Sequence, residues 1–205
     1  MRRDSYEVLL NGNIPAITRV RQLAWELHDS VNQRYDGDLP YGAHLDMVAD
    51  GVITYGHEVI DREADLLPVI FGAYFHDSIE DARQTYNDVL STASRLMDGD
   101  QALMAAEIVY ALTNDKGRTR AERAGERYYA GIRLTPYAPM VKLCDRIANT
   151  RYSAEKTNGS NSIMAQVYRD EYPHFIASIT AAGATDPRLA LPPTAVADLE
   201  RLSQV

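Results

Sequence analysis

Apolar residues recur three and four positions apart through most of this chain, which is the spacing of a buried face on an α-helix. Sustained alternation of apolar and polar residues, the mark of a half-buried β-strand, is scarce. The segments with the helical spacing are residues 14–31, 44–56, 65–77, 102–113, 138–150 and 162–179. The pattern therefore predicts an all-α fold, built as a bundle of helices.

Glycine and proline fall mostly between these segments, and no repeat or low-complexity stretch interrupts them. A length of 205 residues is enough for one domain with a substantial core. We therefore expect residues 1–205 to form a single domain. The last stretch, residues 181–205, is rich in proline, and we expect it to pack as an extension on the outside.

Composition narrows the classes of function. The net charge of −8 argues against a general nucleic-acid binder, whose surface is usually basic. No apolar run approaches the ~18 to 20 residues of a membrane span, and the N-terminus has no signal-peptide core. We expect a cytoplasmic protein. The one cysteine, Cys144, lies in a helical pattern and is expected to be a buried, unreactive thiol.

One local excess of positive charge stands out against the acidic whole. Residues 116–127, "KGRTRAERAGER", hold five lysines and arginines. A local cluster of this kind can bind a small phosphorylated ligand inside an acidic protein. It can equally be a solvated loop and helix face, because two glutamates offset part of its charge.

The stretch "AYFHDSIEDA", residues 73–82, ends a very apolar segment in polar side chains. Pro68 suits the first turn of a helix, and the apolar residues after it predict a central one. If the helix continues, His76 faces the same way as Glu80, and Asp77 the same way as Asp81. Crowded carboxylates need a cation, hydrogen bonds or water. A helix that simply ends in solvated acids is the alternative interpretation.

Two other segments carry matching chemistry. In "APMVKLCDRIANT" Asp145 lies at the edge of an apolar stripe, with Lys142 and Asn149 about one turn to either side of it. In "LPYGAHLDMVADGVI" His44 lies near the start of a predicted helix. The candidate metal donors are then His44, His76, Asp77 and Asp145. Two imidazoles and two carboxylates suit Mn, Fe or Zn, and would leave positions open for water and a phosphate oxygen.

The order of these residues, and the words around them, resemble a known family. His44, then His76-Asp77, then Asp145 follow the H…HD…D order of the helical, metal-dependent HD-domain phosphohydrolases. "AWELHDSVNQRYDGDLPYGAH", "FHDSIEDA" and "VKLCDRIANTR" are similar to three segments of RelA/SpoT-type hydrolase domains. "ALTNDKGRTRAER" is similar to a segment of the short, single-domain members, the metazoan SpoT homologues and their bacterial relatives. The resemblance covers about residues 16–180.

The resemblance implies a fold and a reaction. The fold is an HD-domain helical bundle with the metal in its centre. The reaction is the Mn²⁺-dependent removal of the 3′-pyrophosphate of (p)ppGpp, which gives GDP or GTP and pyrophosphate. By matching positions, the metal ligands would be His44, His76, Asp77 and Asp145. Glu80 and Asp81 match the acidic pair that orients and deprotonates the attacking water.

The resemblance also implies a substrate pocket. Arg34 and Asn149 match positions that contact the nucleoside, and the weaker candidates for phosphate contacts are Lys142, Lys116 and Arg151. The chain departs from the family pattern at three places: Tyr35 replaces a lysine, Leu45 a proline, and Ala148 a polar or aromatic residue. Tyr35 and Ala148 lie near the expected nucleoside pocket, so base specificity is less firmly implied than metal binding.

Two other hypotheses stay open at this point. The same metal site could act on another nucleotide, such as the 2′-phosphate of NADPH or a nucleoside mono- or triphosphate. Alternatively, the chain could be a catalytically silent regulator that binds a nucleotide or a partner. The complete donor set, together with Glu80 and Asp81, argues against the regulator. The sequence does not indicate the oligomeric state or the physiological metal.

Overall fold

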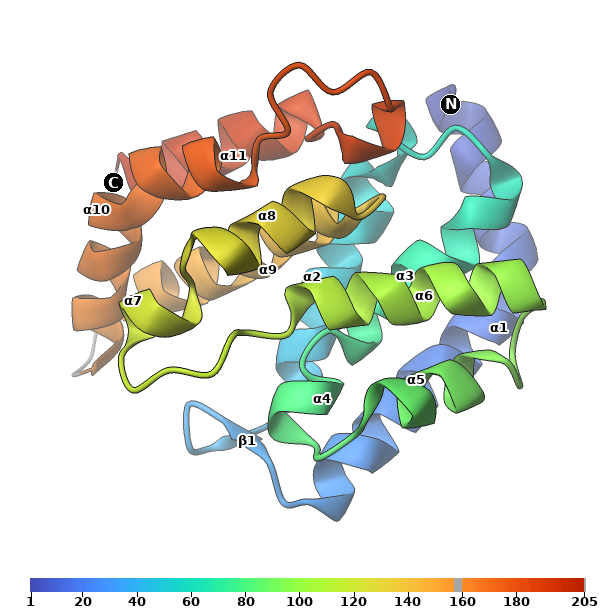
Figure 1. Ribbon diagram of the computed structural model, residues 1–205, viewed down its shortest axis with the longest axis horizontal. Coiled ribbons are helices and arrows are strands. Elements are labelled where there is room, and N and C mark those ends of the chain that lie inside the picture. Colours follow the sequence, from blue (N-terminus) through green and yellow to red (C-terminus); the bar gives the residue numbers. More distant parts are fainter. Residues whose placement is uncertain (157–159, 205) are drawn as a thin grey trace.

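The computed structural model describes residues 1–156 and 160–204, which are almost entirely helical (Figure 1). This confirms the predicted all-α fold. The elements in chain order are α1 Arg3–Ser30, β1 Arg34–Tyr35, β2 Leu39–Pro40, α2 Gly42–Tyr55, η1 Gly56–Glu58, η2 Glu63–Asp65, α3 Leu66–Phe75, α4 Ser78–Asp81, α5 Tyr86–Ala93, α6 Gly99–Leu112, α7 Arg120–Arg123, α8 Glu126–Leu134, α9 Ala138–Glu155, α10 Ser160–Ile179, η3 Pro187–Leu189 and α11 Pro193–Ser203.

The centre of the bundle is made by α2, α3 and α9. Every residue of α3 is buried, because α1, α2 and α6 all pack against it. Helix α9 packs on α2 along one side and on α10 and α11 along the other. The apolar α3 segment is therefore the central helix that its composition predicts.

The central helix ends sooner than the periodicity predicts. Helix α3 stops at Phe75, and the chain turns at His76 and Asp77 before the short α4 begins. The Nδ1 of His76 lies 2.8 Å from the carbonyl oxygen of Ala73. In a continuing helix that oxygen would accept from the backbone N–H of Asp77. The imidazole takes the place of that N–H, so the helix does not continue through Asp81.

Outside the helices, the described residues make one small hairpin. Strands β1 and β2 pair antiparallel, with Tyr35 opposite Leu39. The turn between them places Asp36 and Gly37 at positive φ, 53° and 79°, a conformation that Asp and Gly adopt more readily than most residues. The hairpin lies beside the start of α2 and presents Tyr35 to the polar centre described below.

The C-terminal segment packs on the bundle through α11, which contacts α9, α10 and α2. Ala195 and Leu199 are buried there, and Tyr55 donates a 2.5 Å hydrogen bond to Asp198. Within the described part of the chain, no helix is both long and apolar enough to cross a membrane.

Candidate metal centre

Four side chains from three separate parts of the chain converge between α2, α3 and α9. His44 comes from the first turn of α2, His76 and Asp77 from the turn after α3, and Asp145 from the middle of α9. The Nε2 atoms of the two histidines are 3.3 Å apart, and the Oδ1 of Asp145 lies 3.4 Å and 3.9 Å from those of His44 and His76. The donor atoms of His44, His76 and Asp145 all lie within 4.8 Å of one another.

Asp77 completes the convergence from the fourth side. Its Oδ2 is 3.0 Å from Nε2 of His76 and 3.8 Å from Nε2 of His44. Since metal–ligand bonds of about 2.1 Å place neighbouring donors about 3 to 3.5 Å apart, these separations suit a shared ion. His44, His76 and Asp145 therefore form the tightest set, and Asp77 lies beside its two histidines.

The protonation of the cluster tests whether it fits a cation. The Nδ1 of His76 donates to the carbonyl of Ala73, so a neutral His76 presents the bare lone pair of Nε2 to the cluster. The facing groups are then lone pairs and carboxylate oxygens, buried and close together. Such a set repels itself unless a cation or a proton lies between its members. The donors thus fit a divalent ion.

The pKa values of His76 and Asp77 also indicate that the cluster favours a cation. Burial lowers the pKa of His76, but the charges of Asp77 and Asp145 and the hydrogen bonds to Asp77 and Ala73 outweigh it and raise that pKa to about 9. Burial raises the pKa of Asp77, but the charge and hydrogen bond of His76 bring it below its ordinary value. The pocket strongly favours positive charge at its centre.

Asp145 is held in place by its neighbours on α9. Lys142 Nζ donates 2.9 Å to Oδ2, and Asn149 Nδ2 donates 2.6 Å to Oδ1. The three side chains share one side of the helix, as their spacing predicts. Lys142 is mostly buried, with its ammonium 5.7 Å from the ring centre of Tyr128. The ammonium of Lys142 therefore pairs with the carboxylate of Asp145 and is largely shielded from solvent.

Two tyrosines complete the wall of the cluster. The hydroxyl of Tyr41 donates a 2.5 Å hydrogen bond to Oδ2 of Asp77. Tyr35 stacks on the ring of His44, with centroids 4.8 Å apart, and donates a 2.8 Å hydrogen bond to Oδ1 of Asn149. A chain of contacts therefore runs from Tyr35 through Asn149 to Asp145.

The acidic pair after the cluster is split between two environments. Asp81 is half-buried and accepts a hydrogen bond from Gln33 at 3.3 Å. Its pKa rises to about 6 because of burial and the charges of Asp77 and Glu80. Glu80 is exposed and accepts from the side chain of Asn114 at 3.0 Å, in the connection between α6 and α7. Asp81 therefore contacts the connection that follows α1, whereas Glu80 contacts the connection that follows α6.

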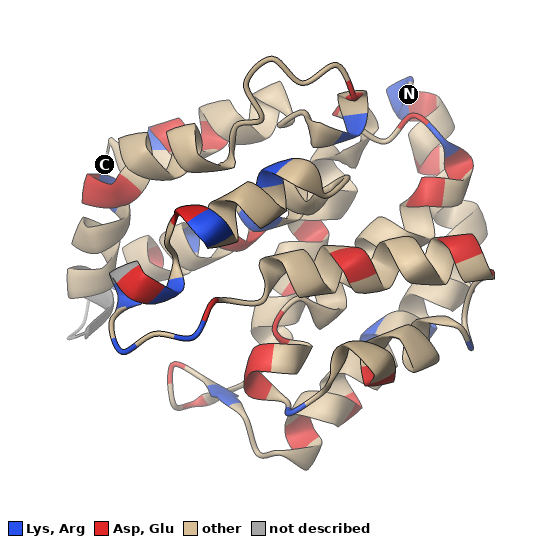
Figure 2. Ribbon diagram, viewed as in Figure 1, with Lys and Arg blue, Asp and Glu red and all other residues tan. Residues whose placement is uncertain are grey.

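The other predicted substrate contacts lie at varying depth. Arg34 is exposed on β1, and Lys116 is exposed in the connection between α6 and α7. Figure 2 shows acidic residues on α4 and basic residues along this connection and α7. Arg151 lies near the side chain of Tyr55. Tyr55 is at the far end of α2 from His44, roughly 16 Å away along the helix axis. The structure does not bring Arg151 to the donor cluster.

Sequence reasoning missed the contacts of Tyr41 and Gln33. Both belong to "QRYDGDLPYGAH", the segment just before His44, so proximity in sequence was a usable signal. His28, from the end of α1, is fully buried and stacks on Tyr41 with centroids 4.7 Å apart. Burial lowers its pKa to about 4, so it is neutral at physiological pH.

With this geometry in hand, the chain can be compared with known proteins. No protein-family model matches it. A solved structure, of a metazoan orthologue of SpoT described as hydrolysing ppGpp and acting in starvation responses, superposes with a TM-score of 0.62. The superposition covers 92% of this chain and 94% of that one, at 20% identity. The two share one fold.

The sequence comparison agrees with this SpoT-type fold. The guanosine-3′,5′-bis(diphosphate) 3′-pyrophosphohydrolase MESH1 of Danio rerio is 28% identical to this chain over 128 residues. The matched region is 62% of this chain and 63% of MESH1, slightly under two thirds of the relative's length. The predicted resemblance to metazoan SpoT homologues, and the predicted helical bundle with a central His/Asp cluster, are confirmed.

Proposed function

We propose that this protein is a metal-dependent pyrophosphohydrolase that removes the 3′-pyrophosphate of (p)ppGpp, leaving GDP or GTP. One observation supports this above the others: two imidazoles and two carboxylates converge in one largely buried cluster, inside a fold shared with a ppGpp-hydrolysing orthologue of SpoT. MESH1, the curated relative, is named for the same activity. We further propose that residues 1–205 act as one hydrolase unit in the cytoplasm.

We assign the metal ligands as His44, His76, Asp77 and Asp145, with Mn²⁺ as the expected ion. A divalent ion held there would polarise a phosphate oxygen. It would also lower the pKa of a water molecule bound to it toward neutral pH. The protein's own contribution is to keep the donors in place. Lys142 and Asn149 orient the carboxylate of Asp145, and Tyr41 orients that of Asp77.

Asp81 is our candidate for the general base. Its raised pKa, about 6, keeps it mostly ionised at neutral pH yet able to accept a proton. Glu80 would support it in two ways: its charge raises the pKa of Asp81, and its hydrogen bond to Asn114 anchors the segment that carries Lys116. Arg34, Asn149 and Lys116 remain our candidates for contacts with the nucleotide, with Lys142 as a weaker one. Arg151 is no longer a candidate, because it lies beside Tyr55 and away from the donor cluster.

A nucleotide panel tests the proposal. The full-length protein is incubated with Mn²⁺ and ppGpp, pppGpp, NADPH or deoxynucleoside triphosphates, and the products are separated by chromatography. We expect pyrophosphate and GDP from ppGpp, and loss of that release in Asp77→Ala and Asp145→Ala. Intact ppGpp after incubation with metal-loaded protein would refute the substrate assignment.

A second candidate function is favoured by one observation. Tyr35 stands where the family has a lysine, and it hydrogen-bonds Asn149, a candidate nucleoside contact. A neutral hydroxyl in place of an ammonium weakens the attraction for a highly charged substrate. Another nucleotide, such as NADPH with its single 2′-phosphate, could then be the better substrate. Release of orthophosphate instead of pyrophosphate in the panel would select this candidate.

A further inference from the structure

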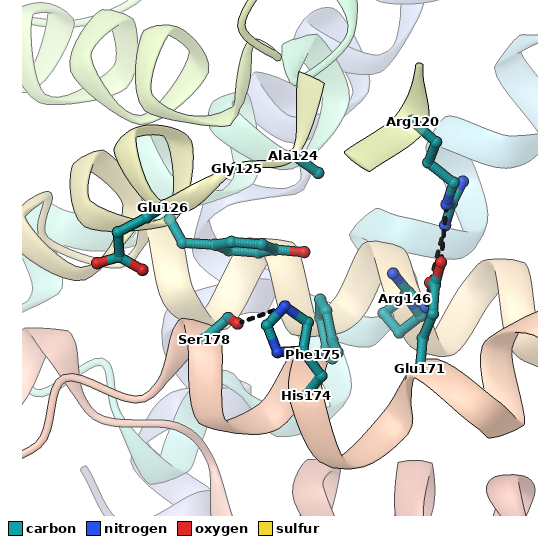
Figure 3. A pocket seen from close by; sticks show the side chains of 10 residues that line it. Arg120, Ala124, Gly125, Glu126, Arg146, Glu171, His174, Phe175 and Ser178 are labelled. Carbon is teal, nitrogen blue, oxygen red and sulfur yellow. Dashed lines mark hydrogen bonds and ion pairs between the residues drawn. The ribbon is translucent and has the colours of Figure 1, made fainter. Parts of the chain in front are cut away.

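A second polar region lies on the other side of α9, away from the donor cluster. Asp145 faces the cluster, whereas its neighbour Arg146 points toward α10, as a rotation of about 100° per residue requires. There Arg146 borders a cavity of about 440 Å³ that is lined by residues of α7, α8, α9 and α10 and of the connection between α7 and α8. Figure 3 shows the side chains that line it. None of the residues lining this cavity belongs to the metal cluster.

The cavity has a positive wall. One carboxylate, Glu171, accepts from both guanidiniums: from Nε and Nη2 of Arg120 at 2.9 and 3.0 Å, and from Nη1 of Arg146 at 2.7 Å (Figure 3). Two cations and one anion leave the trio with a net positive charge. Glu126 also lines the cavity, but its carboxylate is paired with Arg133, whose positive charge balances it.

The guanidinium of Arg146 is unusually well fixed for a ligand-binding group. Its side chain is only 9% exposed, and it lies between the rings of Tyr168 and Phe175, 4.7 and 4.3 Å from their centres. Within the described residues it makes one side-chain hydrogen bond, which leaves most of its N–H donors without a partner. These unused donors are accessible to solvent, so a ligand that enters the cavity can accept hydrogen bonds from them.

Further donors border the same space. Tyr129 is 7% exposed, and among the described residues its hydroxyl has no hydrogen-bond partner. Helix α8 begins beside the cavity at Gly125, and no side chain caps its first N–H groups. The N-terminus of a helix attracts anions through these free N–H groups and the helix dipole. The donors come from several directions, which suits the three terminal oxygens of a phosphate better than the two of a carboxylate.

We propose that this cavity is a binding site for a small phosphate monoester. Arg120, Arg146, Tyr129 and the start of α8 hold the phosphate, while Phe175 and the ring of Tyr129 contact its organic part. The cavity volume lies in the range of small-molecule pockets. The site is separate from the metal centre, so it does not depend on the proposed hydrolase activity.

The test uses phenyl phosphate as the probe and the full-length protein treated with EDTA. Without metal, the donor cluster presents carboxylates that repel phosphate, so binding there is suppressed. Amide shifts in a two-dimensional NMR titration locate the site and give a Kd. We expect shifts in α7, α8 and α10, and binding at least about tenfold tighter than that of benzoate, which has the same ring.

Variants of the lining residues decide the assignment. Arg120 is about half exposed, so Arg120→Gln should fold, and we expect it to weaken phenyl phosphate binding about tenfold or more. Tyr129→Phe removes only a hydroxyl and should cost roughly threefold to tenfold. Arg127→Gln is the matched control, since it removes the same charge from a 91% exposed side chain nearby that does not line the cavity.

Any of the following results would overturn the proposal. One is an unchanged Kd in both Arg120→Gln and Tyr129→Phe. Another is an equal loss in Arg127→Gln, which would mean general charge attraction. The third is binding that appears only when metal is present, or benzoate binding as tight as that of phenyl phosphate. Hydrolysis assays are not needed for any of these outcomes, so failure here is distinct from failure of the proposed function.

Discussion

The two polar regions on either side of α9 are opposite in character. Around Asp145 the facing atoms are lone pairs and carboxylate oxygens, whereas around Arg146 the facing groups are N–H and O–H donors. The region around Asp145 has more acceptors than donors, and the region around Arg146 has more donors than acceptors. The first suits a cation and the second an anion, and one helix separates them. Burial strengthens the preference around Asp145 and Arg146, because charges interact more strongly in a medium of low dielectric constant.

The sharpest test of this contrast removes one charge from each side. Under the proposed function, we expect Asp145→Asn to lower pyrophosphate release from ppGpp by roughly 10²- to 10³-fold, because the proposed metal would lose a charged ligand worth several kcal/mol in the transition state. Metal content should fall with it, as measured by mass spectrometry of the dialysed protein. Glu171→Gln, on the opposite side of α9, should keep activity within about threefold. Equal losses of activity in both variants would show that the two regions do not have separate roles.

Glu171→Gln should reduce the stability of the protein even though it leaves the activity nearly unchanged. Glu171→Gln leaves the largely buried Arg146 without its anionic partner, and we expect the free energy of unfolding to fall by about 1–3 kcal/mol. Urea denaturation followed by circular dichroism measures this. Glu200→Gln, at an exposed position, is the control and should change the value by less than about 0.5 kcal/mol. A Glu171 variant as stable as the wild type would show that the arginines do not need it.

The same carboxylate should make stability depend on pH. Burial raises the pKa of Glu171, but the hydrogen bonds and charges of Arg120 and Arg146 outweigh this and lower it. A carboxyl group with a lower pKa in the folded state stabilises the fold above its unfolded value, about 4.3, and loses that contribution as pH falls through its folded pKa. The stability gap between wild type and Glu171→Gln should therefore narrow from pH 6 to pH 3. A constant gap in urea titrations would contradict this.

The smallest expected effect concerns the outer contacts of the metal centre. Tyr35→Phe keeps the stacking on His44 but removes the hydrogen bond to Asn149. We expect metal affinity, measured by competition with a chelator, to weaken about threefold to tenfold. Tyr86→Phe loses a similar bond to Glu107 on an exposed surface and should leave the affinity unchanged.

The sequence predicts the donors of the metal centre better than it predicts their surroundings. His44, His76, Asp77 and Asp145 stand out because their residue types, the apolar segments around them and the family words agree. The hydrogen bond from Tyr35 to Asn149 joins residues 114 positions apart, which no local pattern reveals. The turn at His76 could not be predicted from helical periodicity, because it depends on a hydrogen bond from the His76 side chain to the backbone carbonyl of Ala73. The basic segment showed its charge, but not that Arg120 and Arg146 share Glu171.

The adjacency of Asp145 and Arg146 limits how this protein can change by insertion and deletion. A substitution in α9 alters one side of the helix at a time. A residue gained or lost upstream within the helix would turn everything after it by about 100°. Asp145 would then leave the donor cluster, and Arg146 would leave Glu171. We therefore expect natural length variation to fall in the connections on either side of α9 and not between Ala138 and Asp145.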